Sequence, residues 1–234
     1  MHLVHGDQFL AIFDGIDPDP RHFVGELAES CSRALGVGGC GISLILGTEH
    51  RGSLGASSTH ARRGEDLQYL LGEGPAFDAV RSQTLVAEPN LGAPRTPRWP
   101  AFAPAAAAEG LEAVFAAPLA VGAASLGALT VYEPHPGDLT PDQSLDLLAL
   151  GEVLSHLVLS LQAGADPGTL AAALDDVRGY HPEIHQATGM LAARLDVPVS
   201  EAMVLLRARA YADGVPLASL AREIVARRIQ FDPE

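Results

Sequence analysis

The sequence predicts an α+β domain with a largely antiparallel sheet, followed by an all-α bundle of three short helices. As far as residue 162, short apolar runs alternate with helical patterns, and short turns join the strand pairs. Helices that bracket such hairpins are typical of an α+β domain. The stretch AGADPG, 163–168, has the composition of a linker, and no strand pattern follows it. The expected domains are therefore 1–162 and 181–231, joined by a linker and connecting helix over 163–180.

The elements of the first domain follow from the spacing of its apolar residues. Helical spacing predicts helices over 21–36 and 140–162, with Thr140 as the N-cap of the second. Two further helices are expected on either side of a turn at GEGP, 72–75. The proline-rich residues 94–104 are expected to form a loop. Strands are expected over 41–47, 51–58, 84–89, 111–121 and 125–133.

Each helix of the second domain begins at a proline, whose fixed φ suits the first helical position. These prolines are Pro182, Pro198 and Pro216. On a helical wheel one face of each helix is apolar. The expected core residues are Ile184, Ala187, Met190, Leu191, Val199, Ala202, Met203, Leu206, Ala210, Leu217, Leu220, Ala221 and Ile224. The opposite face of the first helix is expected to carry His181, His185, Thr188 and Gly189.

Charge divides the chain in the same place. The net charge is -14, and residues 1–177 hold eight arginines against 22 acidic residues. Residues 178–231 hold seven arginines against five acidic residues. Such asymmetry favours two modules with different partners. No signal-peptide pattern and no apolar run of membrane-spanning length occurs, so we expect a cytoplasmic protein.

Motifs of enzymes and metal sites are missing from the sequence. It has no nucleophile elbow, Walker loop or HExxH motif, so we expect neither an enzyme nor a cofactor. The two cysteines, Cys31 and Cys40, do not have CxxC spacing. His181 and His185 lack a third ligand nearby, so no metal site is expected.

Gly189 raises a question of function, because a glycine inside an exposed helix costs about 1 kcal/mol relative to alanine. An exposed glycine lets another backbone approach closely. Arginine and histidine near such a spot suit phosphates or base edges, which makes nucleic-acid binding one hypothesis. The alternative is that the arginines lie on solvated helix faces and that Gly189 packs against a neighbouring helix.

The C-terminal sequence resembles the ANTAR domain, a three-helix RNA-binding module of transcription antitermination regulators. The matching stretch is 184–228, with Gln-Ala-x-Gly at 186–189, Glu-Ala at 201–202 and Leu-Arg at 206–207. The resemblance implies binding to RNA stem-loops and a homodimer. Thr188 stands where many members carry a basic residue. The candidate RNA-binding residues are His181, His185, Gln186, Thr188, Gly189, Arg207, Arg209 and Arg222. Tyr211 is expected to be a boundary residue rather than a base-stacking one.

Residues 1–162 resemble the GAF domain that often precedes this module, on LQYLLGEGPAFDAV at 67–80 and on 98–132. Ala76 stands where relatives often have cysteine. The resemblance implies a domain that senses a signal or dimerises, with a small apolar pocket for a small-molecule ligand. The helix at 140–162 would relay the signal to the bundle.

Two other functions remain open on the sequence alone. The helices at 198–213 and 216–229 are joined by a short glycine turn, as in a DNA-binding helix-turn-helix regulator. Against that reading, the second of them begins VPLASLA, without a row of base-reading side chains. The chain could also be a sensor or dimerisation protein that has lost RNA binding.

Overall fold

The computed structural model describes residues 20–46, 49–93, 98–122, 124–164 and 182–229. The chain divides into two compact units, residues 1–177 and 178–234. The helix expected over 169–180 and the candidate residue His181 lie outside the described residues.

The first unit is built on a five-stranded sheet in the order β2-β1-β5-β4-β3. Each neighbouring pair is antiparallel, which confirms the predicted sheet. The β1–β2 and β4–β5 hairpins join strands that are adjacent in sequence, and β1 pairs with β5 at the centre. The strands are β1 (Cys40–Leu46), β2 (Glu49–Ala56), β3 (Val86–Glu88), β4 (Ala113–Val121) and β5 (Ala124–Glu133).

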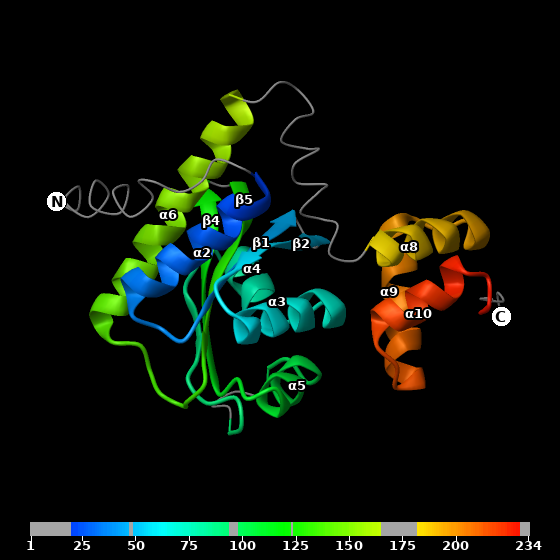
Figure 1. Ribbon diagram of the computed structural model, residues 1–234, viewed down its shortest axis with the longest axis horizontal. Coiled ribbons are helices and arrows are strands. Elements are labelled where there is room, and N and C mark those ends of the chain that lie inside the picture. The colour runs from blue at the N-terminus through cyan, green and yellow to red at the C-terminus, as the bar shows by residue number, and fades with distance from the viewer. Residues whose placement is uncertain (1–19, 47–48, 94–97, 123, 165–181, 230–234) are drawn as a thin grey trace. The chain divides into compact units, whose positions relative to one another are not determined.

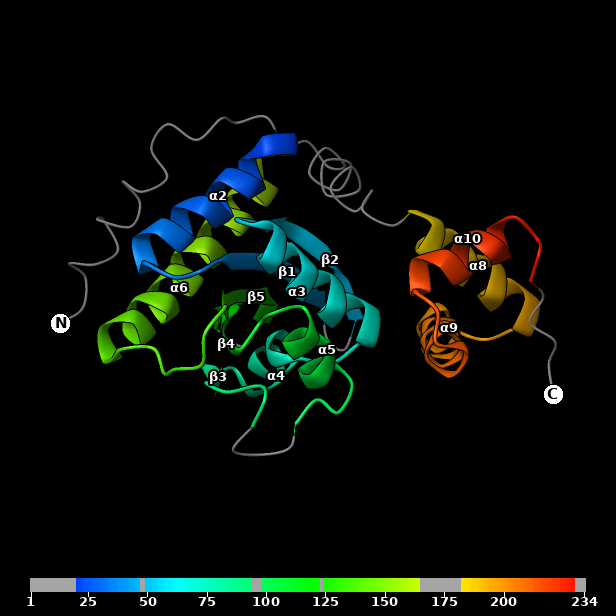
Figure 2. The ribbon, with the colours of Figure 1, turned by 60° about the horizontal axis from the view of Figure 1, so that its bottom comes forward.

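Helices cover both faces of this sheet. Helices α2 and α6 lie on one face, and α3, α4 and α5 lie on the other (Figures 1 and 2). The strand period of two supplies both cores: Phe115 and Ala117 pack toward α2 and α6, whereas Val114 and Ala116 pack on the other side. The helices are α2 (Pro20–Leu35), α3 (Thr59–Leu71), α4 (Pro75–Ser82), α5 (Phe102–Ala108) and α6 (Pro141–Gly164).

The start of α6 agrees with the sequence prediction. The backbone N–H of Gln143 donates to Thr140 Oγ1 at 3.1 Å, and the backbone N–H of Thr140 donates to Gln143 Oε1 at 3.0 Å. This reciprocal capping box satisfies two backbone donors at the start of the helix. Gln143 Nε2 also donates to the carbonyl of Leu35 at 2.9 Å, which ties α6 to the end of α2.

The prediction of a loop over 94–104 is wrong for its last residues, because α5 begins at Phe102. Glu73, in the turn between α3 and α4, supplies the missing start signal. Its Oε1 accepts the backbone N–H groups of Ala101 at 2.7 Å and Phe102 at 2.8 Å. A carboxylate at a helix N-terminus stabilises the first turn, so a residue distant in sequence acts as the cap.

The second unit contains α8 (Pro182–Leu195), α9 (Val199–Asp213) and α10 (Leu217–Val225). Most of the predicted core residues are buried: Ile184, Ala187, Leu191, Ala202, Leu206, Ala210, Leu217, Leu220, Ala221 and Ile224. Val199 is an exception at 61% exposed, because it is the first residue of α9 and lies beyond the packed turns. Met190 and Met203 are half-buried.

Both cysteines are buried free thiols in the core between the sheet, α2 and α6. Burial raises the pKa of Cys31 to about 12 and raises the pKa of Cys40 well above its usual value. In the described part of the chain, no helix is both long enough and apolar enough to cross a membrane.

Candidate functional site

A cluster of buried polar side chains lies between α3 and the sheet in the first unit. Tyr132 on β5 donates its hydroxyl proton to Glu65 Oε1 at 2.7 Å. Gln68 Nε2 donates to the Tyr132 hydroxyl at 2.7 Å, and Gln68 Oε1 accepts the backbone N–H of Ala76 at 2.8 Å. Glu65 and Gln68 are fully buried, and Tyr132 is nearly so. The chain of hydrogen bonds joins α3, β5 and the start of α4.

Two glycines make the room that this cluster occupies. A Cβ on Gly41 of β1 would clash with the Glu65 carboxyl group, and a Cβ on Gly64 would clash with the Tyr132 ring. Glu65 and Tyr132 could not easily move aside, because hydrogen bonds inside the domain hold both side chains. The cluster therefore depends on glycine at both positions.

Burial also sets the charge of the cluster. Desolvation raises the pKa of Glu65 to about 8, with the hydrogen bond from Tyr132 acting in the opposite direction and the nearby carboxylate of Asp66 raising it further. Desolvation likewise raises the pKa of Tyr132. Glu65 is therefore mainly a neutral acid at pH 7, and a neutral carboxyl group can donate one hydrogen bond as well as accept.

Three oxygen atoms around Glu65 have no hydrogen-bond partner among the described residues. They are Glu65 Oε2, Ser43 Oγ on β1 and Thr130 Oγ1 on β5. Ser43 lies close enough to Glu65 to lower its pKa, although the pair lacks hydrogen-bond geometry. Buried polar atoms usually find a partner, so these three mark a place where a proton, a water or a polar ligand atom would be stabilised.

Sequence reasoning missed this cluster, because it expected an apolar pocket. A helical wheel places Glu65 with Ala61 and Gln68, at spacings of four and three residues, on the buried face of α3. A carboxylate on a core-facing stripe is the signal that could have found it.

The candidate residues on α8 divide between the surface and the core. His185, Gln186 and Gly189 are exposed, and a Cβ on Gly189 would meet nothing within 4 Å. Thr188 is only 2% exposed, so its prediction as a surface residue is wrong. It lies one turn after Ile184 on the core side, where its Oγ1 donates to the Ile184 carbonyl at 2.6 Å and lies 3.8 Å from Met203 Sδ.

Two of the candidate arginines, Arg209 and Arg222, are held by contacts within their own helices. Arg209 Nε lies 2.6 Å from Asp213 Oδ2, one turn further along α9. Arg222 donates to the Ala218 carbonyl at 3.2 Å and to Ser219 Oγ at 3.3 Å. Arg207 is half-buried, whereas Arg209 and Arg222 are exposed.

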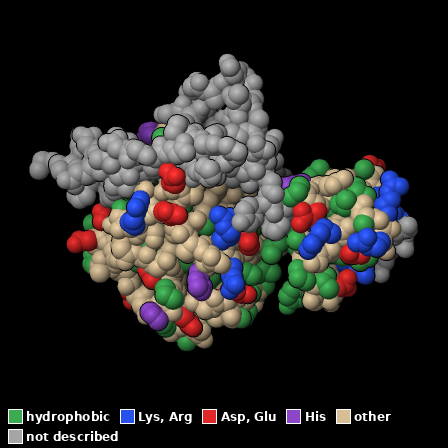
Figure 3. Space-filling view, viewed as in Figure 1, with side chains coloured by type: hydrophobic (Ala, Val, Ile, Leu, Met, Phe, Trp, Pro, Cys, Tyr) green, Lys and Arg blue, Asp and Glu red, His purple; other side chains and the backbone are tan. Residues whose placement is uncertain are grey.

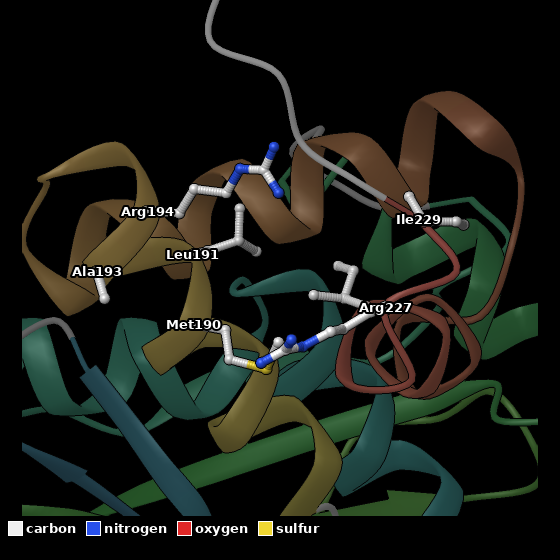
Figure 4. Close-up of a pocket in the computed structure, with 7 residues that line it drawn as sticks. Met190, Leu191, Ala193, Arg194, Arg227 and Ile229 are labelled. Carbon is white, nitrogen blue, oxygen red and sulfur yellow. The ribbon is translucent and has the colours of Figure 1, made fainter.

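A groove of about 510 Å³ lies between α8 and the end of α10. Figure 4 shows Leu191 pointing into it, Arg194 on one side and Arg227 reaching from the end of α10 toward Met190. The sequence analysis assigned no function to either arginine. The lining residues are Met190, Leu191, Ala193, Arg194, Ile224, Arg227 and Ile229.

Arg227 has an unusual backbone for its residue type. Its φ is +57°, in the left-handed region that glycine normally occupies after a helix. The N–H of Arg227 donates to the Ile224 carbonyl at 2.9 Å, and the N–H of Arg228 donates to the Glu223 carbonyl at 2.9 Å. These are the two bonds of a Schellman motif. Two further bonds of 2.7 Å join the Arg228 guanidinium to the Glu223 carboxylate and close the turn.

The surface of the second unit mixes charged and apolar side chains, as Figure 3 shows. On α9, Val204 is 60% exposed and Tyr211 is 77% exposed. Tyr211 is therefore not the boundary residue that the sequence predicted. Among the described residues, no group of three or more His, Cys, Asp or Glu side chains could hold a metal ion.

Comparison with known proteins finds a family match for the C-terminal region. Residues 172–225 match the family model of the ANTAR domain. A comparison with curated proteins finds no match. The chain therefore has an ANTAR domain in its C-terminal region, as the sequence resemblance predicted.

Solved structures similar to the chain are GAF domains and proteins of related fold. The GAF domain of a phosphoenolpyruvate-protein phosphotransferase from Acinetobacter has a TM-score of 0.50 at 14% identity, covering 71% of this chain and 99% of its own. The corresponding domain from Coxiella burnetii has a TM-score of 0.51 at 14% identity, covering 68% and 96%. A free methionine-R-sulfoxide reductase from Neisseria meningitidis, in complex with its substrate, has a TM-score of 0.50 at 15% identity, covering 68% and 89%. At these identities the likeness establishes a GAF-like fold.

Proposed function

We propose that the protein is a signal-responsive transcription antitermination regulator that binds hairpin loops in nascent RNA. The observation that carries the proposal is the match of residues 172–225 to the ANTAR domain. The exposed Gly189 face and the surface arginines of the second unit support it, since both suit a phosphate backbone. The protein would act by binding rather than catalysis, in the cytoplasm and as a homodimer.

Hairpin RNA is the proposed target, because the splayed bases of a loop expose edges and stacking faces. Tyr211 offers an exposed ring for such stacking. The surplus of arginine over acidic residues in 178–231 is small, so phosphate neutralisation alone would give weak binding. Recognition would therefore depend on loop bases as well as on charge.

The test is a selection with the full-length protein and a pool of hairpin RNAs that share one stem and have randomised loops. We expect enrichment of particular loops, with weaker binding to the same stem as duplex RNA or duplex DNA. The double variant Arg207→Ala/Arg209→Ala should weaken binding and reduce its dependence on salt. Arg63→Ala, which removes an exposed charge from α3, is the matched control. Enrichment of no loop contradicts the proposal, and preference for duplex DNA assigns the bundle to DNA.

The first unit is proposed to receive the signal as a small molecule near Glu65. The unpartnered oxygens of Glu65, Ser43 and Thr130 support this, because a polar ligand atom would satisfy them. Native mass spectrometry of the protein purified from its own cell should detect an added mass that is absent from Glu65→Leu. Identical masses for the two proteins would contradict a ligand at this cluster.

A further inference from the structure

We propose that the groove between α8 and the end of α10 receives one unpaired nucleotide of the RNA loop. Its base would lie on the apolar lining of the groove, and its phosphate would bind Arg227. The inference rests on the proposed function and adds the place and the chemistry of contact, which the candidate residues from sequence do not include.

The chemistry of the groove matches a nucleotide. Its apolar lining includes Met190, Leu191, Ile224 and Ile229. The two exposed arginines of the lining, Arg194 and Arg227, extend their guanidinium groups beside it (Figure 4). An apolar lining of aliphatic side chains removes the flat face of a base from water, whichever base it is. A guanidinium group pairs with a phosphate through two parallel hydrogen bonds. The volume of about 510 Å³ falls within the range of roughly 300–1,000 Å³ that is common for ligand sites.

The backbone at Arg227 argues for a use of its side chain. A left-handed conformation is unfavourable for any residue with a Cβ, and glycine is the usual residue at this position of a Schellman motif. Here the position holds an exposed arginine, and the turn around it is closed by the Arg228–Glu223 pair. Strained residues of this kind cluster at binding sites, where surrounding structure holds them in place.

The approach to the groove is open on the α8 side. Gly189 and Ala193 lie one turn apart on the exposed face of α8, and Ala193 also lines the groove. Both residues are small, and a Cβ at Gly189 would meet no atom of the described residues within 4 Å. A nucleic-acid backbone could therefore run along this face and place one base in the groove.

An acidic peptide could also satisfy two arginines, but the groove favours a nucleotide. The described part of the lining contains no hydrogen-bonding side chain other than the two guanidinium groups. A peptide would bury an amide group at every residue there without a partner, whereas a base carries its polar groups only on its edges and can place its flat face on the apolar lining.

The variant Arg227→Gly separates folding from binding. Glycine favours the left-handed conformation, so the full-length variant should be at least as resistant to thermal unfolding as the wild type. Its affinity for a hairpin selected by the wild type should fall about tenfold. The slope of log affinity against log salt concentration should also become less steep by about 0.7, as expected for the loss of one phosphate contact to a single strand.

A second pair of changes tests the base. Met190→Ala should weaken binding to the selected hairpin without changing the salt slope, because the side chain is uncharged. The same comparison is made with hairpins that each lack the base at one loop position. At one of these positions, removal of the base should make Met190→Ala and the wild type bind almost equally. Arg63→Ala should leave both affinity and slope unchanged.

The possible failures can be told apart. If no hairpin is selected, the proposed function fails. If a hairpin is selected but Arg227→Gly binds it with wild-type affinity and slope, RNA binding stands and the groove is overturned as its site. A third outcome is that a glutamate-rich peptide binds the wild type but not Arg227→Gly, and displaces the hairpin with a higher affinity than any loop variant has. The occupant of the groove is then an acidic peptide, and the proposal is also overturned.

Discussion

Replacement of Gly189 by alanine should stabilise α8 and weaken RNA binding at the same time. Gly189 lies inside α8, on its exposed face, and a Cβ there would meet nothing within 4 Å. The substitution therefore brings no clash within the described molecule. The gain is the difference in helix propensity, about 1 kcal/mol.

Hydrogen exchange in the full-length protein measures this gain locally. A stabilisation of about 1 kcal/mol slows the exchange of α8 amides about fivefold where exchange follows opening of the bundle. Ala208→Gly, on the exposed face of α9, is the matched control and should accelerate exchange in α9 by a similar factor. RNA affinity is measured on the same samples with a selected hairpin.

The two measurements can refute the reasoning separately. Faster exchange in α8 of Gly189→Ala would mean that the space at Gly189 is needed within the protein. Slower exchange with unchanged RNA affinity would mean that no backbone approaches this face. Only slower exchange together with an affinity loss of about tenfold agrees with close approach of RNA.

Three further predictions concern other parts of the structure. The pKa of Glu65 is raised from 4.5 to about 8, so between these pH values the folded state keeps a proton that the unfolded chain loses. The stability contributed by the protonated Glu65 is therefore fully present below about pH 4.5 and is lost as the pH rises to about 8. The free energy of unfolding should fall by up to about 5 kcal/mol over this pH range in the wild type. Urea unfolding measured at a series of pH values should show no such fall in Glu65→Gln. The same pH dependence in the two proteins would contradict a buried neutral acid at Glu65. Thr140→Ala should lower the free energy of unfolding of the first unit by about 1 kcal/mol in urea, through loss of the α6 cap, and an unchanged midpoint would argue against the capping box. Thr188→Val should leave hairpin affinity within twofold of wild type in a titration, because Thr188 is buried; a larger loss would place Thr188 at the interface.

The fold could be read from the sequence wherever the signal is local. The β4 and β5 strands are mainly apolar segments joined by a turn at Gly122, and α6 begins with its own capping residues. The start of α5 could not be read, because its cap is Glu73, which is brought to Ala101 only by the tertiary fold. The helix propensity of a proline-rich segment gives no information about a contact with a residue that is distant in sequence.

The candidate sites divide in a similar way. Periodicity correctly placed Gly189 on the surface, but Thr188 follows Ile184 by four residues and precedes Leu191 by three, which is the spacing of the buried face, so the sequence already contained the signal for its burial. The position of Arg227 beside the groove could not be predicted from the sequence, because it depends on a turn that closes beyond the end of α10. The Glu65 cluster depends on pairing between α3 and β5, which are far apart in sequence.

The two buried thiols have a consequence for the kind of signal that the first unit can report. With a pKa of about 12, Cys31 is a thiolate in on the order of one molecule in 100,000 at pH 7. Cys40 is shifted in the same direction. Peroxides and electrophiles react with the thiolate, so both residues should be slow to oxidise while the domain is folded. The folded first unit should therefore not report oxidation through its own sulfur atoms.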